Sequence, residues 1–183
     1  METYISILRG INVGGKNKVL MDDLKKLYAG LNFKNIRTYI QSGNVIFDFE
    51  KTNPDQLSRQ IENKISEKYK FHVPVIIRTV FELHETLNKN PFLKENNIDF
   101  EKLHITFLSD EPEKLKTEDI KNYNYAPDKF ISLNKEVYIY CPNGYGNTKL
   151  NNTFFERKLS VSATTRNLKT VTELIRIAEL DNQ

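Results

Sequence analysis

The stretch Arg37–Phe49, RTYIQSGNVIFDF, decides the fold of the first half of the chain. Two runs of β-branched and aromatic residues, 36–40 and 45–49, flank the polar tetrapeptide Gln41-Ser-Gly-Asn44. Strand-forming residues on both sides of a short turn that contains glycine are typical of a β-hairpin. We therefore expect two antiparallel strands joined by a tight turn.

The flanking sequence extends this hairpin into a larger pattern. Short apolar runs predict a strand at residues 4–8 and another at residues 73–80. Leu20, Leu24 and Leu27 have the spacing of one helix face, and Asn53-Pro54 opens a second stretch with helical spacing. The predicted order is β-α-β-β-α-β, which is the ferredoxin-like arrangement.

The second half repeats this order around the hairpin DKFISLNKEVYIYC at residues 128–141. Its other expected elements are a strand, two helices, a short strand and a closing helix, at residues 103–108, 113–121, 148–159, 161–165 and 168–180. We predict an α+β protein of two packed ferredoxin-like lobes, residues 1–92 and 99–183, the second of which carries the C-terminal helix. A single mixed sheet is the alternative.

Composition limits the class of protein. The 183 residues are 39% hydrophobic and 28% charged, as is ordinary for a globular protein, and no apolar run approaches the length of a membrane span. Without a signal peptide and with Cys141 as the single cysteine, a cytoplasmic location is the expectation. The three histidines and the thiol lack metal-ligand spacing, so we expect no metal and no cofactor.

Charge is distributed unevenly, although the net value is only +3. Residues 9–18 contain three bases and no acid, and residues 145–170 contain five bases against Glu156. Residues 99–119 are acidic, with seven acids against three lysines. Solvated surface is one explanation of such clusters, and an anionic ligand is the other.

The first basic segment is LRGINVGGKNKVL, residues 8–20. A glycine-rich turn between a strand and a helix exposes successive backbone N–H groups and can form an anion site. Arg9 could chelate two phosphate or carboxylate oxygens, and Lys16 could add a point charge. No Gly-Lys-Ser or Gly-Lys-Thr sequence closes the segment as in a Walker A loop, and the dinucleotide-binding glycine spacing is also missing. The alternative is that its glycines serve turn geometry alone.

Two further segments place a base beside the start of a predicted helix. In SATTRNLKTVTEL, Thr165 or Asn167 can cap the last helix, while Arg166 opposes its dipole unless an anion lies between them. In NGYGNTKLNN, Lys149 follows a glycine turn. If the lobes face each other, these segments and the first loop could meet in one basic groove.

Four stretches taken together closely resemble the uncharacterised bacterial family named domain of unknown function 1697: LRGINVGGKNKV, RTYIQSGNVIF, GYGNTKLNN and ATTRNLKTVTEL. The resemblance implies a compact two-lobed α+β protein and no established activity. The chain departs from the family pattern at Leu168, where that pattern often has a tryptophan. The resemblance also marks candidate site residues, namely Arg9, Gly10, Asn12, Gly14, Gly15, Lys16, Gln41, Ser42, Gly43, Asn44, Lys149, Leu150, Thr165, Arg166 and Asn167.

Three hypotheses of function follow. The first is a protein that binds a phosphate-bearing small molecule or nucleic acid through Arg9, Lys16, Lys149 and Arg166. The second is an enzyme in the same groove, with Tyr145 or Ser42 as hydroxyl participants. The third is an RNA-binding module with stacking aromatics, although Tyr4, Phe47 and Phe49 are expected in the core. No membrane partner is predicted, and the sequence does not define an oligomeric state.

Overall fold

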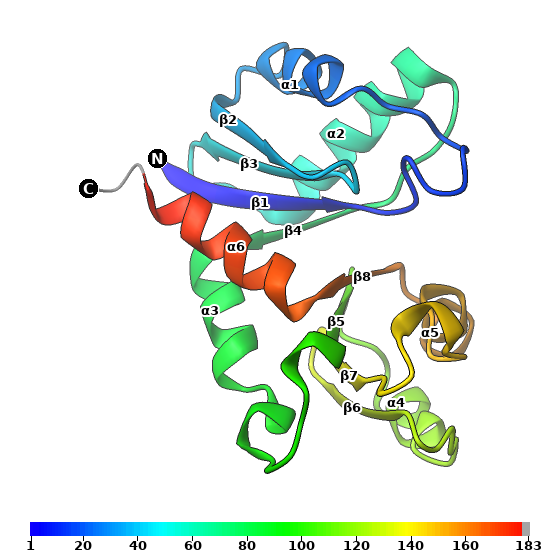
Figure 1. The fold of residues 1–183 in the computed structure, drawn as a ribbon. Coiled ribbons are helices and arrows are strands. Elements are labelled where there is room, and N and C mark those ends of the chain that lie inside the picture. Colours follow the sequence, from blue (N-terminus) through cyan, green and yellow to red (C-terminus); the bar gives the residue numbers. More distant parts are fainter. Residues whose placement is uncertain (181–183) are drawn as a thin grey trace. The chain divides into compact units, whose positions relative to one another are not determined.

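The computed structural model describes residues 1–180 and shows a mixed α+β protein (Figure 1). The described chain has two four-stranded antiparallel sheets and six α-helices, which confirms the predicted α+β class. Its contacts divide it into two compact units. Unit 1 comprises residues 1–84 with residues 173–180, and unit 2 comprises residues 85–172.

This division differs from the predicted lobes, residues 1–92 and 99–183. The chain passes from one unit to the other inside two helices, α3 (Val80–Asn88) and α6 (Leu168–Glu179). The segment at the predicted boundary between the lobes forms a 3-10 turn, η1 (Pro91–Lys94), whose Phe92 is buried. A polar, proline-bearing composition favours a linker, but it does not show whether an aromatic residue within it is packed.

Unit 1 builds its sheet in the order β2-β3-β1-β4. Its elements before α3 are β1 (Glu2–Leu8), α1 (Met21–Ala29), β2 (Lys34–Tyr39), β3 (Asn44–Phe49), α2 (Pro54–Tyr69) and β4 (Val75–Thr79). Helices α1 and α2 cover one face of this sheet, where Tyr4 and Leu8 of β1 join the core (Figure 1). Asn53 caps α2 by accepting a hydrogen bond from the backbone N–H of Asp55, at 2.8 Å. Both hairpin strands and both helices lie where the sequence predicted them.

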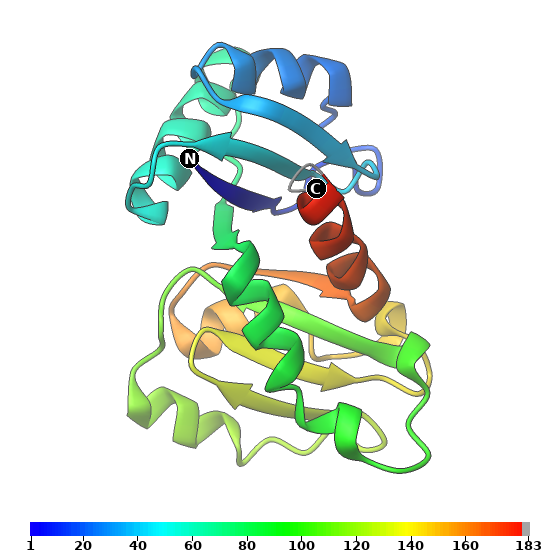
Figure 2. The same ribbon diagram turned by 90° about the vertical axis from the view of Figure 1, so that its left-hand side faces the viewer.

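Unit 2 has the same plan, with its sheet in the order β6-β7-β5-β8 (Figure 2). Its elements are η2 (Phe100–Lys102), β5 (Leu103–Leu108), α4 (Lys114–Ile120), β6 (Lys129–Leu133), β7 (Glu136–Tyr140), η3 (Tyr145–Asn147), α5 (Asn152–Leu159) and β8 (Ala163–Asn167). Helix α5 packs on one face of this sheet, where its Phe154, Phe155 and Leu159 join the core.

Two predicted boundaries in unit 2 were wrong. Helix α5 begins at Asn152 and not at residue 148, because Asn151 caps it through a 3.0 Å hydrogen bond from the Phe154 N–H. Leu150 is buried but lies outside the helix, so its spacing from Phe154 imitated a helical repeat. Strand β8 extends to Asn167, beyond the expected end at residue 165.

The two units repeat each other down to strand register. Ile5 of β1 pairs with Arg78 of β4, and Ile105 of β5 pairs with Arg166 of β8. Each arginine is buried and donates from Nη1 to the carbonyl of the residue before it, at 3.0 Å for Arg78 and 2.9 Å for Arg166. In both units the fourth strand runs directly into a helix, α3 or α6. Each unit is therefore one copy of a common β-α-β-β-α-β plan.

Two kinds of feature are absent from residues 1–180. None of the helices there has the length and apolar character needed to cross a bilayer. The same residues contain no group of three or more histidine, cysteine or carboxylate side chains that could hold a metal ion.

Candidate functional site

Residues 9–20, which we call the basic glycine loop, connect β1 to α1 and form a small hairpin-like projection. The Asn12 N–H donates to the Asn17 carbonyl at 3.2 Å, and the Lys16 N–H donates to the Val13 carbonyl at 3.1 Å. Gly14 and Gly15 at its tip have φ angles of 56° and 75°, as the two central residues of a type I′ turn require. A Cβ on either glycine would have open space around it, so the backbone conformation is what demands glycine.

Asn12 fixes this loop to the β2–β3 hairpin. Its Nδ2 donates to the carbonyls of Val19 and Gln41, both at 2.9 Å, and its Oδ1 accepts from the Val19 N–H at 2.9 Å. Gly43 packs beside the loop so closely that a Cβ there would lie 2.7 Å from Cδ1 of Ile11. The loop and the hairpin turn therefore form one packed corner of unit 1.

A hollow of about 430 Å³ lies at this corner, where α1 begins. Leu20 precedes α1 without a side-chain cap, so no side chain occupies the N–H groups of the first helical turn. Lys16 and Lys18 are exposed and form no salt bridge within residues 1–180. The hollow is lined by Asn12, Gly15, Lys18, Val19, Leu20, Met21, Asp22 and Gln41.

Side chains of the turn between β2 and β3 hold the turn together by hydrogen bonds. Asn44 is fully buried and donates from Nδ2 to the Tyr39 carbonyl at 3.1 Å and to the Ser42 Oγ at 3.0 Å. Of the predicted turn residues, Gln41 lines the hollow, whereas Ser42 and Asn44 hold the turn. Arg9 is half-buried, and its backbone N–H donates to the Pro74 carbonyl at 2.9 Å.

Arg166 of unit 2 has a different environment from the one the sequence suggested. It is 9% exposed, and its Nη1 donates to the Thr164 Oγ1 at 3.0 Å as well as to the Thr165 carbonyl. Burial lowers the pKa of its guanidinium to about 10. The helix cap is Asn167, whose Oδ1 accepts from the Thr170 N–H at 2.8 Å. The protein thus supplies partners for this arginine, and its position before α6 gives no separate sign of an anion.

Thr165 is the centre of a hydrogen-bonded cluster rather than a helix cap. Its hydroxyl lies 3.0 Å from the Tyr145 hydroxyl, which donates to it, and 2.7 Å from the Thr106 hydroxyl. It donates in turn to the Asn152 Oδ1 at 2.6 Å. The His104 ring stacks on Tyr145 with centroids 4.7 Å apart, and burial holds the pKa of His104 below its usual range.

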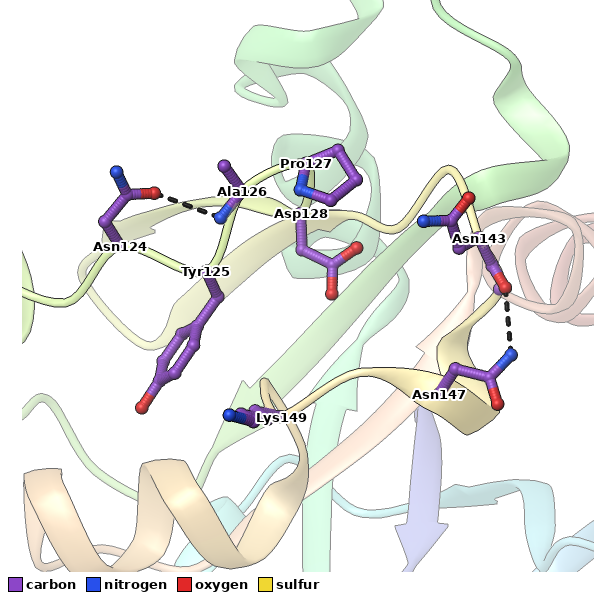
Figure 3. A pocket seen from close by; sticks show the side chains of 9 residues that line it. Asn124, Tyr125, Ala126, Pro127, Asp128, Asn143, Asn147 and Lys149 are labelled. Atoms are coloured by element: carbon purple, nitrogen blue, oxygen red, sulfur yellow. Dashed lines mark hydrogen bonds between the residues drawn. The ribbon is translucent and has the colours of Figure 1, made fainter.

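Lys149 lines a second hollow, of about 490 Å³, which we call the unit 2 hollow (Figure 3). It lies between the loop before β6 and the loop after β7, and its lining contains three asparagines, an aspartate and a tyrosine. The sequence pattern did not reveal this set, because residues 121–125 have the composition of a connecting loop. A signal was nevertheless present in the proline-bearing stretch NYAPD, residues 124–128. The lining residues are Asn124, Tyr125, Ala126, Pro127, Asp128, Asn143, Gly144, Asn147 and Lys149.

The structure thus brings together Asn12, Gly15 and Gln41 in unit 1, with Lys18 added, and places Lys149 in a hollow of unit 2. The single groove expected from Arg9, Lys16, Lys149 and Arg166 stays a prediction.

Comparison with known proteins identifies the family. A family model described as "Protein of unknown function (DUF1697)" matches residues 1–138. The chain belongs to the DUF1697 family. No curated protein matches the chain. The conserved bacterial protein SP0830 from Streptococcus pneumoniae has a similar fold, with a TM-score of 0.76 at 21% identity over 97% of this chain and 98% of that one.

The DUF1697 match covers the basic glycine loop and the β2–β3 hairpin, and so includes the whole packed corner of unit 1. The segments GYGNTKLNN and ATTRNLKTVTEL lie after residue 138, outside the match. The family assignment therefore rests on unit 1 and the first part of unit 2.

Proposed function

We propose that this DUF1697 protein binds a phosphate-bearing ligand, a nucleotide or a nucleic-acid end, at the basic glycine loop. The observation that supports the proposal is the difference between this loop and its counterpart in unit 2. The β1–α1 connection takes the twelve residues 9–20, whereas the equivalent β5–α4 connection takes the five residues 109–113. Because five residues make the same connection, the longer loop exceeds what the fold requires.

The chemistry of the two connections also differs. The unit 2 connection, Ser109–Glu113, contains three acids and no base, whereas the basic glycine loop contains Arg9, Lys16 and Lys18 and no acid. Lys18 lines the hollow at the open first turn of α1, and Lys16 is exposed in the same loop, so their ammonium groups suit an anion. Asp22 also lines the hollow, so we place the phosphate on the side of Lys16 and Lys18.

Binding is favoured over the two other hypotheses by particular side chains. Tyr4 and Phe47 are fully buried in the unit 1 core, where no base could stack on them as in an RNA recognition motif. The Ser42 hydroxyl accepts a hydrogen bond from Asn44 inside the turn. Among residues 1–180 the unit 1 hollow is lined by the carboxylate of Asp22 but by no histidine, cysteine or tyrosine that could act beside it as a second acid–base group.

Two finer statements belong to the same proposal. The strand orders support ferredoxin-like units, since the order β-α-β-β-α-β in one antiparallel sheet is the arrangement of that fold. A cytoplasmic location is supported by the single cysteine of the sequence.

The test is thermal unfolding of the whole chain with inorganic phosphate, pyrophosphate, AMP and ATP. At least one of these should raise the Tm, because a ligand at a hundred times its Kd adds about 2.7 kcal/mol to the free energy of unfolding. In Lys16→Ala the affinity should fall about fivefold to tenfold, while Lys26→Ala, on the exposed side of α1, should bind as the parent does. If none of the four probes moves the Tm of the parent protein, the proposal is wrong.

The predicted sharing of one ligand by the two units has its own test. Lys16→Ala and Lys149→Ala should be combined and the affinity for the best probe measured. Coupled losses would show that both lysines act on one ligand, and Lys149→Ala without effect would restrict the site to unit 1.

A further inference from the structure

Part of the unit 2 hollow is formed by a connection that, like the basic glycine loop, is longer than the equivalent connection in the other unit. Residues 141–151 join β7 to α5, whereas the equivalent connection of unit 1, between β3 and α2, takes only residues 50–53. The additional residues supply Asn143, Gly144, Asn147 and Lys149 to the hollow. The connection between the third strand and the second helix thus takes four residues in unit 1 and eleven residues in unit 2.

The polar groups of this hollow offer both hydrogen-bond donors and acceptors to a guest. The Oδ2 of Asp128 accepts from the Thr148 hydroxyl at 2.6 Å, and that hydroxyl accepts from the Leu150 N–H at 3.1 Å. This chain of bonds orients the carboxylate and leaves its Oδ1 without a partner among residues 1–180. Lys149 forms no salt bridge in that part of the chain, so its ammonium group remains a donor.

The asparagines add oriented amide groups on both sides of the hollow (Figure 3). The Oδ1 of Asn124 accepts from the Ala126 N–H at 3.0 Å, which leaves its Nδ2 as a donor. The Nδ2 of Asn147 donates to the Asn143 carbonyl at 3.1 Å, which leaves its Oδ1 as an acceptor. Each amide is thus held by one bond and has a second group for a ligand.

An aromatic wall completes the site. Tyr125 packs edge-on against Phe154, with ring centroids 5.5 Å apart, and the Lys149 Nζ lies 5.9 Å from the centroid of the tyrosine ring. The Tyr125 hydroxyl has no hydrogen-bond partner among residues 1–180. The volume of about 490 Å³ lies within the range of about 300–1,000 Å³ usual for small-ligand sites.

This donor and acceptor set discriminates between ligand classes. A phosphate carries negative charge on its oxygens and would meet the Asp128 carboxylate, which repels it. A hydroxyl group donates and accepts at once, so neighbouring hydroxyls can donate to Asp128 and accept from Lys149 or an asparagine. A flat ring face suits the apolar C–H side of a saturated sugar ring.

We propose that the unit 2 hollow is a binding site for a polyhydroxylated ring, the ribose of a nucleoside or a free sugar. The residues that form this site are not those of the basic glycine loop, and the proposal does not depend on the phosphate proposal. Asp128 accepts from the hydroxyls, Lys149 donates to them, the asparagine side chains of the lining add further contacts, and Tyr125 forms the wall against the ring.

The test is NMR titration of the ¹⁵N-labelled full chain with methyl β-D-ribofuranoside, adenosine, methyl α-D-glucopyranoside and inorganic phosphate. We expect saturable shifts at residues 124–128 and 143–149 with a ribose compound or with the glucoside, and no such shifts with phosphate. Which of the compounds binds more tightly distinguishes a ribose site from a sugar site. No sugar-induced shift in these segments, or a stronger response to phosphate there, would overturn the proposal.

Variants of the lining residues test whether the named side chains contact the ligand. Asp128→Asn keeps an acceptor for Thr148 but loses the charge, and should weaken binding of the probe by about tenfold. Asn143→Ala removes an exposed side chain and should weaken binding about threefold to tenfold without affecting the fold. Asp119→Asn, on the exposed side of α4, is the matched control and should bind as the parent does. Unchanged affinity in both Asp128→Asn and Asn143→Ala would contradict the assignment.

Discussion

Unit 1 and unit 2 share their strand order and register, but each has its long connection at a different place. In unit 1 the chain is lengthened between β1 and α1, and in unit 2 it is lengthened between β7 and α5 and between α4 and β6. The first insertion brings lysines and glycines, and the second brings asparagines beside an aspartate and a tyrosine. The comparison teaches that a common scaffold leaves its loops free to acquire different chemistry.

The strands themselves also differ at equivalent positions. Tyr4 of unit 1 corresponds by register to His104 of unit 2, and Ile77 corresponds to Thr165. In unit 1 this sheet face is an aromatic and aliphatic core that contains one buried polar pair, the Ser6 and Tyr28 hydroxyls, which lie 2.7 Å apart. In unit 2 the same end of the face is a hydrogen-bonded cluster around Thr165. The same sheet face therefore holds a single hydroxyl pair in unit 1 and a larger polar cluster around Thr165 in unit 2.

The largest effect is expected at the hairpin turns. Gly43 of unit 1 corresponds to Lys135 of unit 2, because their carbonyls accept from Leu8 and Leu108 at 2.8 Å. Gly43→Ala should destabilise the protein by about 2–4 kcal/mol, since its φ of 80° is strained for alanine and the new Cβ would meet Ile11. Chemical denaturation measures the loss.

Lys135→Ala is the matched control, and its cost should stay within about 0.5 kcal/mol. Equal losses in Gly43→Ala and Lys135→Ala would mean that the two hairpins pack alike, against the structure.

The next effect concerns the anchoring of the basic glycine loop, for which unit 2 has no equivalent. Asn12→Ala removes three hydrogen bonds to the main chain of Val19 and Gln41, and should cost about 2–3 kcal/mol. Asn17→Ala, which removes a single bond to the Gly10 carbonyl, should cost about 1 kcal/mol. Urea unfolding of both variants checks the order, and a reversed order would show that Asn12 does not fix the loop.

A smaller effect sharpens the contrast between the sheet faces. Thr165→Val keeps the shape of the side chain but leaves Tyr145 and Asn152 without their shared partner, at a cost of about 1–2 kcal/mol. Ile77→Thr at the equivalent place in unit 1 should also destabilise, because it removes buried apolar volume from the core. Thermal unfolding measures the loss, and an unchanged stability in Thr165→Val would show that the cluster adds nothing to the stability of the protein.

The smallest effect is a dependence on pH that unit 1 lacks at the equivalent position. Burial lowers the pKa of folded His104 below its ordinary value of 6.5, so the folded state disfavours protonation. Stability from this group is complete above about pH 7 and declines as the pH falls through about 6.5. The urea midpoint should fall less between about pH 7 and about pH 5 in His104→Gln than in the parent protein. An identical decline in both would exclude His104 as its source.

The order of elements was predictable because local signals determine it. Alternating residues around Gln41–Asn44 and Asn134–Lys135 define the two hairpins, and the cap Asn53 with Pro54 defines the start of α2. The start of α5 was missed because Leu150 and Phe154 have helical spacing, whereas Asn151, the residue that caps the helix, lies between them.

The candidate sites were less predictable, because burial is a property of the folded chain. Arg166 looks like a cation at a helix start, but it is buried on β8 with protein acceptors. Gly14 and Gly15 were identified as candidates, and the turn that needs them is visible only in the bridge between Val13 and Lys16. The unit 2 hollow joins residues 124–128 to residues 143–149, and no local pattern links such segments.

The route of the chain through α3 and α6 has a consequence for the synthesis of the protein. Unit 2 is one uninterrupted segment, residues 85–172, whereas unit 1 includes residues 173–180 in addition to the first 84. During translation all of unit 2 has been polymerised before the last piece of unit 1 exists. The first residues of unit 1 are therefore synthesised before unit 2, and its residues 173–180 are synthesised after unit 2.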